Sequence, residues 1–187
     1  MNNEPTENTL IADEPMQYLT FRLDGEAFAT GITRIREVLE YTHVTKVPRM
    51  PDYMLGVINL RGNVVPVVDL RKQFDMTIAE VTVDTCIIII EVNVDGNATV
   101  LGALADSVQE VIELKAEQLE PAPSLGTRVD NRFIRAMGKL DERFVIVLDM
   151  DRVFSAEQLE GLVENGDGDA MPPPVLQAEM STTAESA

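Results

Sequence analysis

Residues 56–70 read GVINLRGNVVPVVDL, which is two apolar runs separated by a short break. The runs cover residues 56–60 and 64–70. Arg, Gly and Asn occupy residues 61–63, and a break of this kind is typical of a turn between two strands. The pattern therefore predicts a β-hairpin. Pro66 cannot donate a backbone hydrogen bond, so it predicts an edge strand or a bulge in the second run.

The second run has a counterpart later in the chain. Residues 64–70 match residues 144–150 at an offset of eighty. Further matching segments occur in the same order in both halves: Asp24-Gly25 with Asp95-Gly96, residues 36–39 with 109–112, Pro48 with Pro121, and Phe74 with Phe154. An ordered set of matches predicts an internal repeat, at about residues 17–75 and 86–154. Chance similarity between two β-rich halves is the alternative.

Each half contains about five short strands with tight turns, which suits a small barrel or a curled sheet. Residues 18–23 alternate, with Leu19, Phe21 and Leu23 on one face. The β-branched run at residues 86–92 is the best candidate for a fully buried strand. The expected fold class is mainly β, with two small barrels packed together and short helical turns.

The two ends of the chain differ from its middle. Residues 1–16 are polar, and we expect them to be disordered. Ser155 and Gln158 fit a capping box, which predicts a C-terminal helix at about residues 156–164. Residues 166–187 are predicted to form an acidic disordered tail.

Charge is concentrated at these ends. The net charge is −17, but residues 1–16 carry four acids and no base, and residues 155–187 carry seven acids and no base. Nucleic acids and anionic membranes both require basic patches, and none is visible in the sequence. We therefore expect no nucleic-acid partner, and we assign the acidic ends to solubility.

Cysteine content and hydropathy indicate the compartment. Cys86 is the single cysteine, which fits a reducing compartment. The longest apolar run, residues 86–90, is far shorter than the roughly 20 residues of a membrane span. The first twenty residues carry no base and no long apolar run, which argues against a signal peptide. A cytoplasmic protein without direct membrane insertion is expected.

The sequence offers no recognisable combination of catalytic residues. His43 is the single histidine, no motif surrounds it, and we expect a surface position. Cys86 opens a buried-looking strand and is expected in the core, because a nucleophilic cysteine needs an electropositive, exposed setting. Asp69 ends a strand like a phosphoacceptor, but Asp149 repeats the feature, which favours a structural role. No phosphate-binding glycine loop or metal-ligand spacing is present, so we expect no cofactor, no metal and no enzyme activity.

The hairpin tip is the candidate for contact with a partner protein. Arg61 would lie exposed at this tip, and arginine is favoured at interfaces. Asp141 takes its place in the second half, so the repeat itself does not require arginine there. A plain turn residue is the alternative interpretation.

Several motifs, taken in order, resemble the CheW family of chemotaxis coupling proteins. They are Tyr18-Leu-Thr-Phe, Ile35-Arg-Glu-Val38, Thr45-Lys-Val-Pro48, Gly56-Val-Ile-Asn-Leu-Arg-Gly62, Val65-Pro-Val-Val-Asp-Leu-Arg71, Phe74, Leu101-Gly-Ala-Leu-Ala-Asp106, Val108-Gln-Glu-Val111 and Glu120-Pro-Ala-Pro123. The likeness covers roughly residues 16–165, and the ordered set is more specific than any one motif. The related CheA and CheV proteins carry additional domains, which favours a free-standing CheW.

The resemblance implies two five-stranded barrels like Src-homology-3 folds within a CheW-like domain at residues 17–165. It implies a non-enzymatic adaptor with two protein partners. These are the histidine kinase CheA, through its regulatory domain, and the cytoplasmic tip of a chemoreceptor. Such an adaptor would be cytoplasmic and recruited to membrane receptor arrays through its partners.

The resemblance also implies where the partners bind. We expect the receptor between the two barrels, at residues in two motifs: Ile35, Glu37, Val38, Gly56, Asn59, Leu60, Arg61 and Gly62. The kinase contact is expected on the first barrel. Glu37 and Arg61 have opposite charges, and we hypothesise an ion pair that holds the hairpin against the neighbouring segment.

Two other readings remain open at this point. A CheW-like adaptor could serve a related receptor–kinase pathway that controls surface motility or gene expression, and genomic neighbours would separate this from chemotaxis. An unrelated enzyme on a β-barrel scaffold is the third reading. Its weakness is the single histidine, the single cysteine and the absence of a paired catalytic motif.

Overall fold

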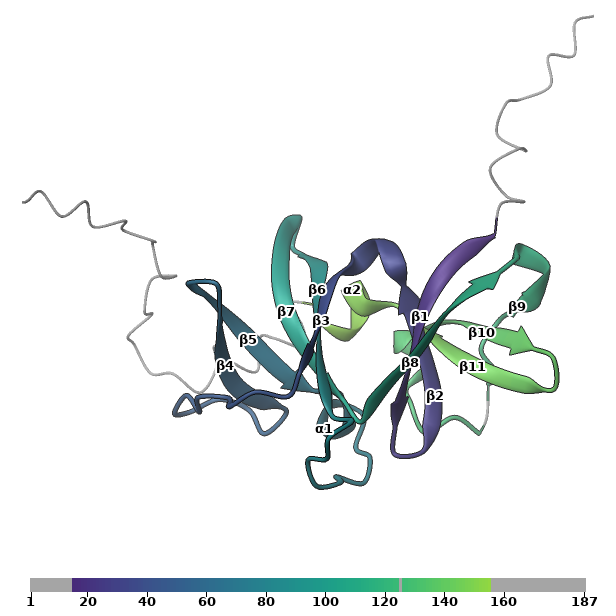
Figure 1. Cartoon of the computed structure of the whole chain (residues 1–187). Coiled ribbons are helices and arrows are strands. Elements are labelled where there is room, and N and C mark those ends of the chain that lie inside the picture. The colour runs from purple at the N-terminus through teal and green to yellow at the C-terminus, as the bar shows by residue number, and fades with distance from the viewer. Residues whose placement is uncertain (1–14, 125, 156–187) are drawn as a thin grey trace, which may run out of the picture.

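The computed structural model of the chain describes residues 15–124 and 126–155. Its strands form a six-stranded and a five-stranded sheet that lie side by side (Figure 1). The predicted C-terminal helix, the acidic tail and nearly all of the predicted N-terminal segment lie outside the described residues. The fold class is confirmed, because the architecture is mainly β and contains two small sheets packed together, like paired Src-homology-3 barrels.

The six-stranded sheet has the strand order β8-β1-β2-β11-β10-β9. All its neighbouring strands are antiparallel except β11 and β2, which are parallel. Its strands are β1 (Met16–Leu23), β2 (Glu26–Gly31), β8 (Ser107–Leu114), β9 (Leu119–Glu120), β10 (Ile134–Leu140) and β11 (Arg143–Leu148).

The five-stranded sheet has the order β3-β6-β7-β5-β4, with β5 and β7 parallel. Its strands are β3 (Ile35–Glu40), β4 (Met54–Leu60), β5 (Asn63–Asp69), β6 (Cys86–Val94) and β7 (Asn97–Ala105). Short helical turns complete the fold: η1 (Ile32–Arg34), α1 (Leu70–Gln73), η2 (Ala116–Gln118), η3 (Asn131–Phe133) and α2 (Met150–Val153).

The two sheets do not follow the two halves of the chain. The β1–β2 hairpin of the first half joins β8 to β11 of the second, and the β6–β7 hairpin of the second half joins β3 to β5 of the first. The expectation that each half forms its own barrel is therefore wrong. Tight turns determine each hairpin, but they leave open which sheet the hairpin joins, because that depends on long-range pairing.

Apolar residues form three clusters. The largest lies between the sheets and draws side chains from both, including the phenylalanine row Phe21, Phe28, Phe74 and Phe133, whose successive ring centroids are 6.0, 6.2 and 5.8 Å apart. One smaller cluster belongs to each sheet. β6 is buried on both faces, as predicted, since Ile88 and Ile90 face the central cluster while Ile87 and Ile89 face the five-stranded sheet's own cluster.

The hairpin predicted at residues 56–70 is formed by β4 and β5. The expected effect of Pro66 is not observed, because β5 lies between β7 and β4 and is an interior strand. Pairing with β7 begins at Val67, one residue after the proline. The missing N–H is therefore tolerated, and the irregularity in this hairpin lies in β4, between Met54 and Gly56.

Candidate functional site

The candidate site is built on the β4–β5 turn. Leu60 pairs with Asn63, which leaves a two-residue loop of Arg61 and Gly62 with φ angles of 51° and 88°. Positive φ at both residues is the geometry of a type I′ turn, which matches the twist of a hairpin. Asn59 Oδ1 accepts a hydrogen bond from the Gly62 N–H at 2.8 Å and holds the loop.

Arg61 is an unusual residue at this position. Three other two-residue hairpin loops in the described chain have Asp24, Asp95 and Asp141 at the corresponding position, with φ of 47°, 50° and 50°. Aspartate is among the few residues that enter left-handed backbone readily, whereas a long side chain there is strained by roughly 1 kcal/mol or more. An arginine in this place indicates that its side chain is needed beyond the turn.

The Arg61 side chain reaches across the sheet to Glu37. Arg61 Nη1 donates to Glu37 Oε1 at 2.8 Å, and Nη2 donates to Oε2 at 2.9 Å. The arginine side chain is 75% exposed and the glutamate side chain 25% exposed. β3 and β4 are opposite edges of the five-stranded sheet, so this bidentate pair links the two edges. The hypothesised ion pair is present.

A hollow of about 470 Å³ lies beside this pair, and we call it the edge hollow. Its apolar lining includes Leu60, Val64, Val65, Ile89 and Val100. Arg36 also lines it and forms an ion pair with Glu91. The hollow thus combines an apolar floor with charged groups at its rim. All of its lining residues belong to β3–β7, so it opens on the five-stranded sheet and not between the two sheets.

The six-stranded sheet has an equivalent hollow of about 350 Å³. Its lining includes Glu110, Phe144 and Val145, which correspond to Glu37, Val64 and Val65 in the repeat. The turn residue there is Asp141, and Glu110 forms no ion pair within residues 15–124 and 126–155. Among the residues that the structure describes, only those of the five-stranded sheet form this charged link between edges.

Comparison with known proteins identifies the family. The family model that describes the CheW-like domain matches residues 17–158. The chain belongs to the CheW family. Chemotaxis protein CheW of Klebsiella aerogenes is 32% identical over 149 residues, which cover 80% of this chain and 87% of that protein. Chemotaxis protein CheW of Rhizobium meliloti is 32% identical over 144 residues, covering 77% and 90%.

A solved structure supports the same conclusion. The crystal structure of the scaffolding protein TtCheW from Thermoanaerobacter tengcongensis matches this chain with a TM-score of 0.68 and 32% identity. The match covers 75% of this chain and 92% of TtCheW. The CheW-family architecture therefore applies to almost the whole described chain.

The eight residues expected at the receptor site take different places in this CheW-family fold. Glu37, Leu60 and Arg61 line the edge hollow. Asn59 and Gly62 form the turn that presents Arg61. These five residues form one unit, which we call the hairpin site.

Ile35 and Val38 lie away from the hairpin site. A register shift between Ile35 and Glu37 turns the Ile35 side chain toward the central cluster between the sheets. Val38 is 42% exposed. Strand alternation alone would have placed Ile35 and Glu37 on one face, and a bulge of this kind leaves no clear signal in the sequence.

Gly56 has a structural reason to be glycine. Its φ is 141°, and an added Cβ would lie 2.0 Å from the Thr45 carbonyl oxygen. Thr45 and Val57 exchange two backbone hydrogen bonds of 2.9 Å at this point. The close approach pairs the segment that follows β3 with β4 and so helps to close the sheet.

Residues that sequence reasoning missed also line the edge hollow. Val64 is 62% exposed although it belongs to an apolar run, and Val100 lies across the hollow in β7. An apolar residue next to a hairpin tip could have indicated Val64. Nothing in the local sequence of β7 indicates Val100, because its position depends on the parallel pairing of β5 with β7.

The residues considered as catalytic candidates occupy core, surface or helix-capping positions. Cys86 is 7% exposed, and burial raises its pKa to about 11, so it is a core residue as expected. His43 is exposed between β3 and β4. Asp69 caps α1 by accepting a hydrogen bond from the Arg71 N–H at 3.0 Å, and Asp149 caps α2 in the same way. Both aspartates therefore have structural roles.

The described part of the chain contains neither a metal-binding cluster nor a helix that could span a membrane. No group of three or more histidine, cysteine or acidic side chains there is arranged to hold a metal ion. The two α-helices described have four residues each, far fewer than the roughly 20 needed to cross a bilayer.

Proposed function

We propose that this CheW-family chain is a non-enzymatic chemotaxis scaffold that couples chemoreceptors to the histidine kinase CheA. Family membership supports the scaffold role, since a similar solved protein is described as a scaffolding protein and the similar curated proteins as chemotaxis proteins. The chain works in the cytoplasm and reaches receptor arrays at the membrane through its partners.

The receptor tip docks at the hairpin site and in the edge hollow. The observation that carries this assignment is Arg61, which occupies a strained turn position where the other hairpin loops have aspartate. The receptor tip is a bundle of helical hairpins, and a helix docks through apolar side chains in a groove with a few polar contacts at the rim. The apolar floor and the Glu37–Arg61 pair provide both elements.

The regulatory domain of CheA contacts a different surface, which we assign by family likeness to the rest of the five-stranded sheet. A scaffold needs two surfaces that are occupied together. Because the hairpin site uses only Glu37 of β3, the end of β4 and the turn that follows β4, the remainder of the sheet stays available for the kinase. No individual residue is assigned to this second contact.

Co-sedimentation tests the proposal. Purified chain is mixed with receptor-containing membranes and CheA, and kinase autophosphorylation is followed in the same samples. Wild type is expected in the pellet with raised kinase activity. Arg61→Ala is expected to remain folded and to lose both effects. Asp95→Asn, at the corresponding turn position of the β6–β7 hairpin, is the matched control and should behave as wild type.

The outcomes separate the two parts of the proposal. A wild type that joins the pellet and activates the kinase, with an Arg61→Ala variant that does the same, supports the scaffold role and rejects the hairpin site. A wild type that neither sediments nor activates with its cognate partners rejects the scaffold role itself.

A further inference from the structure

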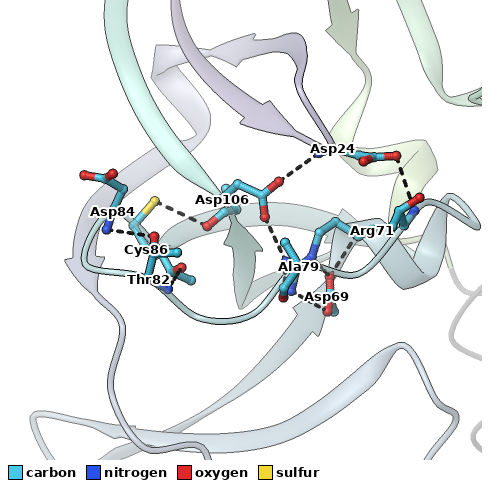
Figure 2. A network of polar contacts seen from close by, with 11 residues as sticks. Asp24, Asp69, Arg71, Ala79, Thr82, Asp84, Cys86 and Asp106 are labelled. Carbon is cyan, nitrogen blue, oxygen red and sulfur yellow. Dashed lines mark hydrogen bonds and ion pairs between the residues drawn. The ribbon is translucent and has the colours of Figure 1, made fainter.

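A chain of polar contacts runs through the junction of the two sheets. Arg71 is its centre and is 3% exposed. Its Nε and Nη2 donate to the two carboxylate oxygens of Asp69 at 3.0 Å each, and its Nη1 donates to Asp106 Oδ1 at 2.8 Å. Figure 2 shows Asp106 between Arg71 and Asp24.

The chain of contacts continues into the six-stranded sheet. Asp106 Oδ2 accepts from the backbone N–H of Asp24 at 2.8 Å. Asp24 Oδ2 in turn accepts from Arg128 Nη1 at 2.9 Å. The backbone N–H of Asp106 donates to the Arg22 carbonyl at 3.0 Å. We call Asp69, Arg71, Asp106, Asp24 and Arg128 the junction network.

The topology gives this network its significance. Asp106 is the single residue between β7 of the five-stranded sheet and β8 of the six-stranded sheet. Asp24 is in the β1–β2 turn of the six-stranded sheet, whereas Asp69 ends β5 of the five-stranded sheet and Arg71 lies in α1, which follows β5. The path from Arg71 through Asp106 to Asp24 therefore runs from one sheet to the other.

The network also lies at the far end of β5, the strand that begins directly after the turn of the hairpin site. β5 begins two residues after Arg61 and ends at Asp69. Its seven residues extend over roughly 20 Å at the ordinary rise of a strand. A displacement of the hairpin on docking would thus reach the junction through one continuous strand.

The burial of the network is graded along its length. Arg71 and Asp69 are 3% and 2% exposed, Asp106 and Asp24 are 24% and 23% exposed, and Arg128 is 61% exposed. Burial acts to lower the pKa of Arg71, but the hydrogen bonds and charges of Asp69 and Asp106 outweigh it and raise the pKa. The cation is therefore permanent, while its contacts to the six-stranded sheet lie nearer to water and are easier to exchange.

The other large contact between the sheets is the central apolar cluster. Apolar burial is non-directional and by itself tolerates small changes in the angle between two packed layers. Hydrogen bonds to charged groups have preferred distances and angles and so define an orientation. The junction network is therefore suited to specify the angle between the sheets, alongside the contacts that Asp151 of α2 makes with Arg34 and with the Asn93 N–H of β6.

We propose that the junction network is a lock that sets the angle between the two sheets, and that kinase control by a docked receptor depends on this lock. The regulatory part rests on the proposed scaffold function. In this arrangement the hairpin site determines whether the receptor binds. The lock determines whether binding at one sheet is transmitted to the rest of the scaffold.

Spin labels measure the distance between the two sheets, and hence test the lock, in the absence of any partner protein. Glu40→Cys on β3 and Lys139→Cys on β10 place one exposed label on each sheet, and the buried Cys86, whose pKa is raised, stays unlabelled. Double electron–electron resonance is expected to give a narrow distance distribution in the otherwise unchanged chain. Asp106→Asn and Arg128→Ala should broaden it. Asp95→Asn, which alters an exposed turn aspartate outside the network, should leave it narrow.

The same variants are then compared in the receptor and kinase assay. Asp106→Asn keeps the Asp69–Arg71 pair and Arg128→Ala changes an exposed side chain, so both variants are expected to fold, as checked by circular dichroism. Receptor affinity should stay within about twofold of wild type, because neither residue contacts the hairpin site. Kinase activation should fall roughly fivefold or more, the lower end of ordinary coupling between sites.

Each outcome decides one part of the inference. Unchanged distance distributions in both variants would refute the lock. Broadened distributions with full kinase activation would refute its role in control, and so would a loss of receptor affinity equal to the loss of activation. If wild type binds no receptor, the proposed function and the regulatory role fail together, while the distance distributions still decide whether the lock exists.

Discussion

Glu37 and Arg61 join the two opposite edges of the five-stranded sheet. Glu37 lies on β3 and Arg61 in the turn that follows β4, and these two strands share no ladder because β6, β7 and β5 separate them. Their carboxylate and guanidinium groups nevertheless meet through two hydrogen bonds of 2.8 and 2.9 Å. The pair is placed where the sheet curls back on itself, so that one charged contact both closes the sheet and borders the edge hollow.

Replacing Arg61 by asparagine separates stability from docking. Asparagine suits left-handed backbone better than arginine, so the turn should gain stability, while the exposed ion pair contributes only about 0–1 kcal/mol. We expect Arg61→Asn to unfold within about 1 kcal/mol of wild type in urea. Receptor co-sedimentation should be lost, because the guanidinium is absent.

The matched comparison is Asp95→Asn, which makes the same residue at another hairpin turn. This variant should keep both its stability and its receptor binding. Full receptor binding by Arg61→Asn would mean that the strained arginine serves the fold alone.

A double-mutant cycle measures the coupling between Glu37 and Arg61. The single variants Glu37→Gln and Arg61→Gln and the double variant are compared for receptor affinity and for stability. We expect a coupling energy of at least about 1 kcal/mol in receptor binding, since a bidentate pair fixes geometry, and less than about 1 kcal/mol in folding. A coupling in binding that cannot be distinguished from zero would show that the two groups act independently.

Gly56→Ala should destabilise the fold strongly. The added Cβ would meet the Thr45 carbonyl oxygen at 2.0 Å, and the residue would keep a φ of 141° that side-chain-bearing residues avoid. We expect a loss of about 3 kcal/mol or more, seen as a lower urea midpoint. Gly31→Ala is the control, because the nearest atom to its added Cβ is 4.0 Å away. Equal midpoints for the two variants would contradict this reading.

Arg71→Met should be among the most damaging single changes. It leaves Asp69, whose side chain is 2% exposed, without its cation, and breaking a buried pair from one side costs about 3–5 kcal/mol. Adding Asp69→Asn to this variant should recover part of the loss, because the uncompensated charge is removed. Thermal unfolding by circular dichroism measures the series. Arg132→Met, which alters an exposed pair within one loop, should change little.

The thiol of Cys86 should resist alkylation in the folded chain. Burial raises its pKa from 9.0 to about 11, so almost no thiolate is present at pH 8. The contribution of this shift to stability is complete below about pH 9 and is lost as the pH rises toward 11. Iodoacetamide labelling with and without urea, followed by mass spectrometry, tests this. Labelling at equal rates in both conditions would show that the thiol is accessible.

Local signals in the sequence account for much of the fold. Alternating and β-branched runs predicted the strands, and the break at Arg61-Gly62 predicted a hairpin turn that the structure contains, because both depend on residues close in the chain. The Glu37–Arg61 pair could be predicted because the two residues lie in recognisable motifs and have opposite charges. The sequence did not predict which sheet each hairpin joins, because that depends on contacts between residues far apart in the chain.

The junction network shows the same limit at the level of single residues. Arg71 follows Asp69 in the sequence, and the sequence alone gives no reason to place this arginine in the interior. Its burial depends on Asp106, thirty-five residues later, and on the β1–β2 turn. Polar residues that are buried by long-range pairing carry no periodic signal.

The exchange of hairpins between the two halves has a consequence for how such a chain can arise. In a single copy of the repeat, the hairpin could complete a sheet only by filling the gap between the other three strands of that copy. Two separate copies could complete both sheets by trading hairpins instead, as a swapped dimer does. Gene duplication and fusion would then turn an obligate pair into one chain, and the sequence of each half would be free to diverge. Arg61 at one turn and Asp141 at its counterpart are the kind of difference that such divergence would produce.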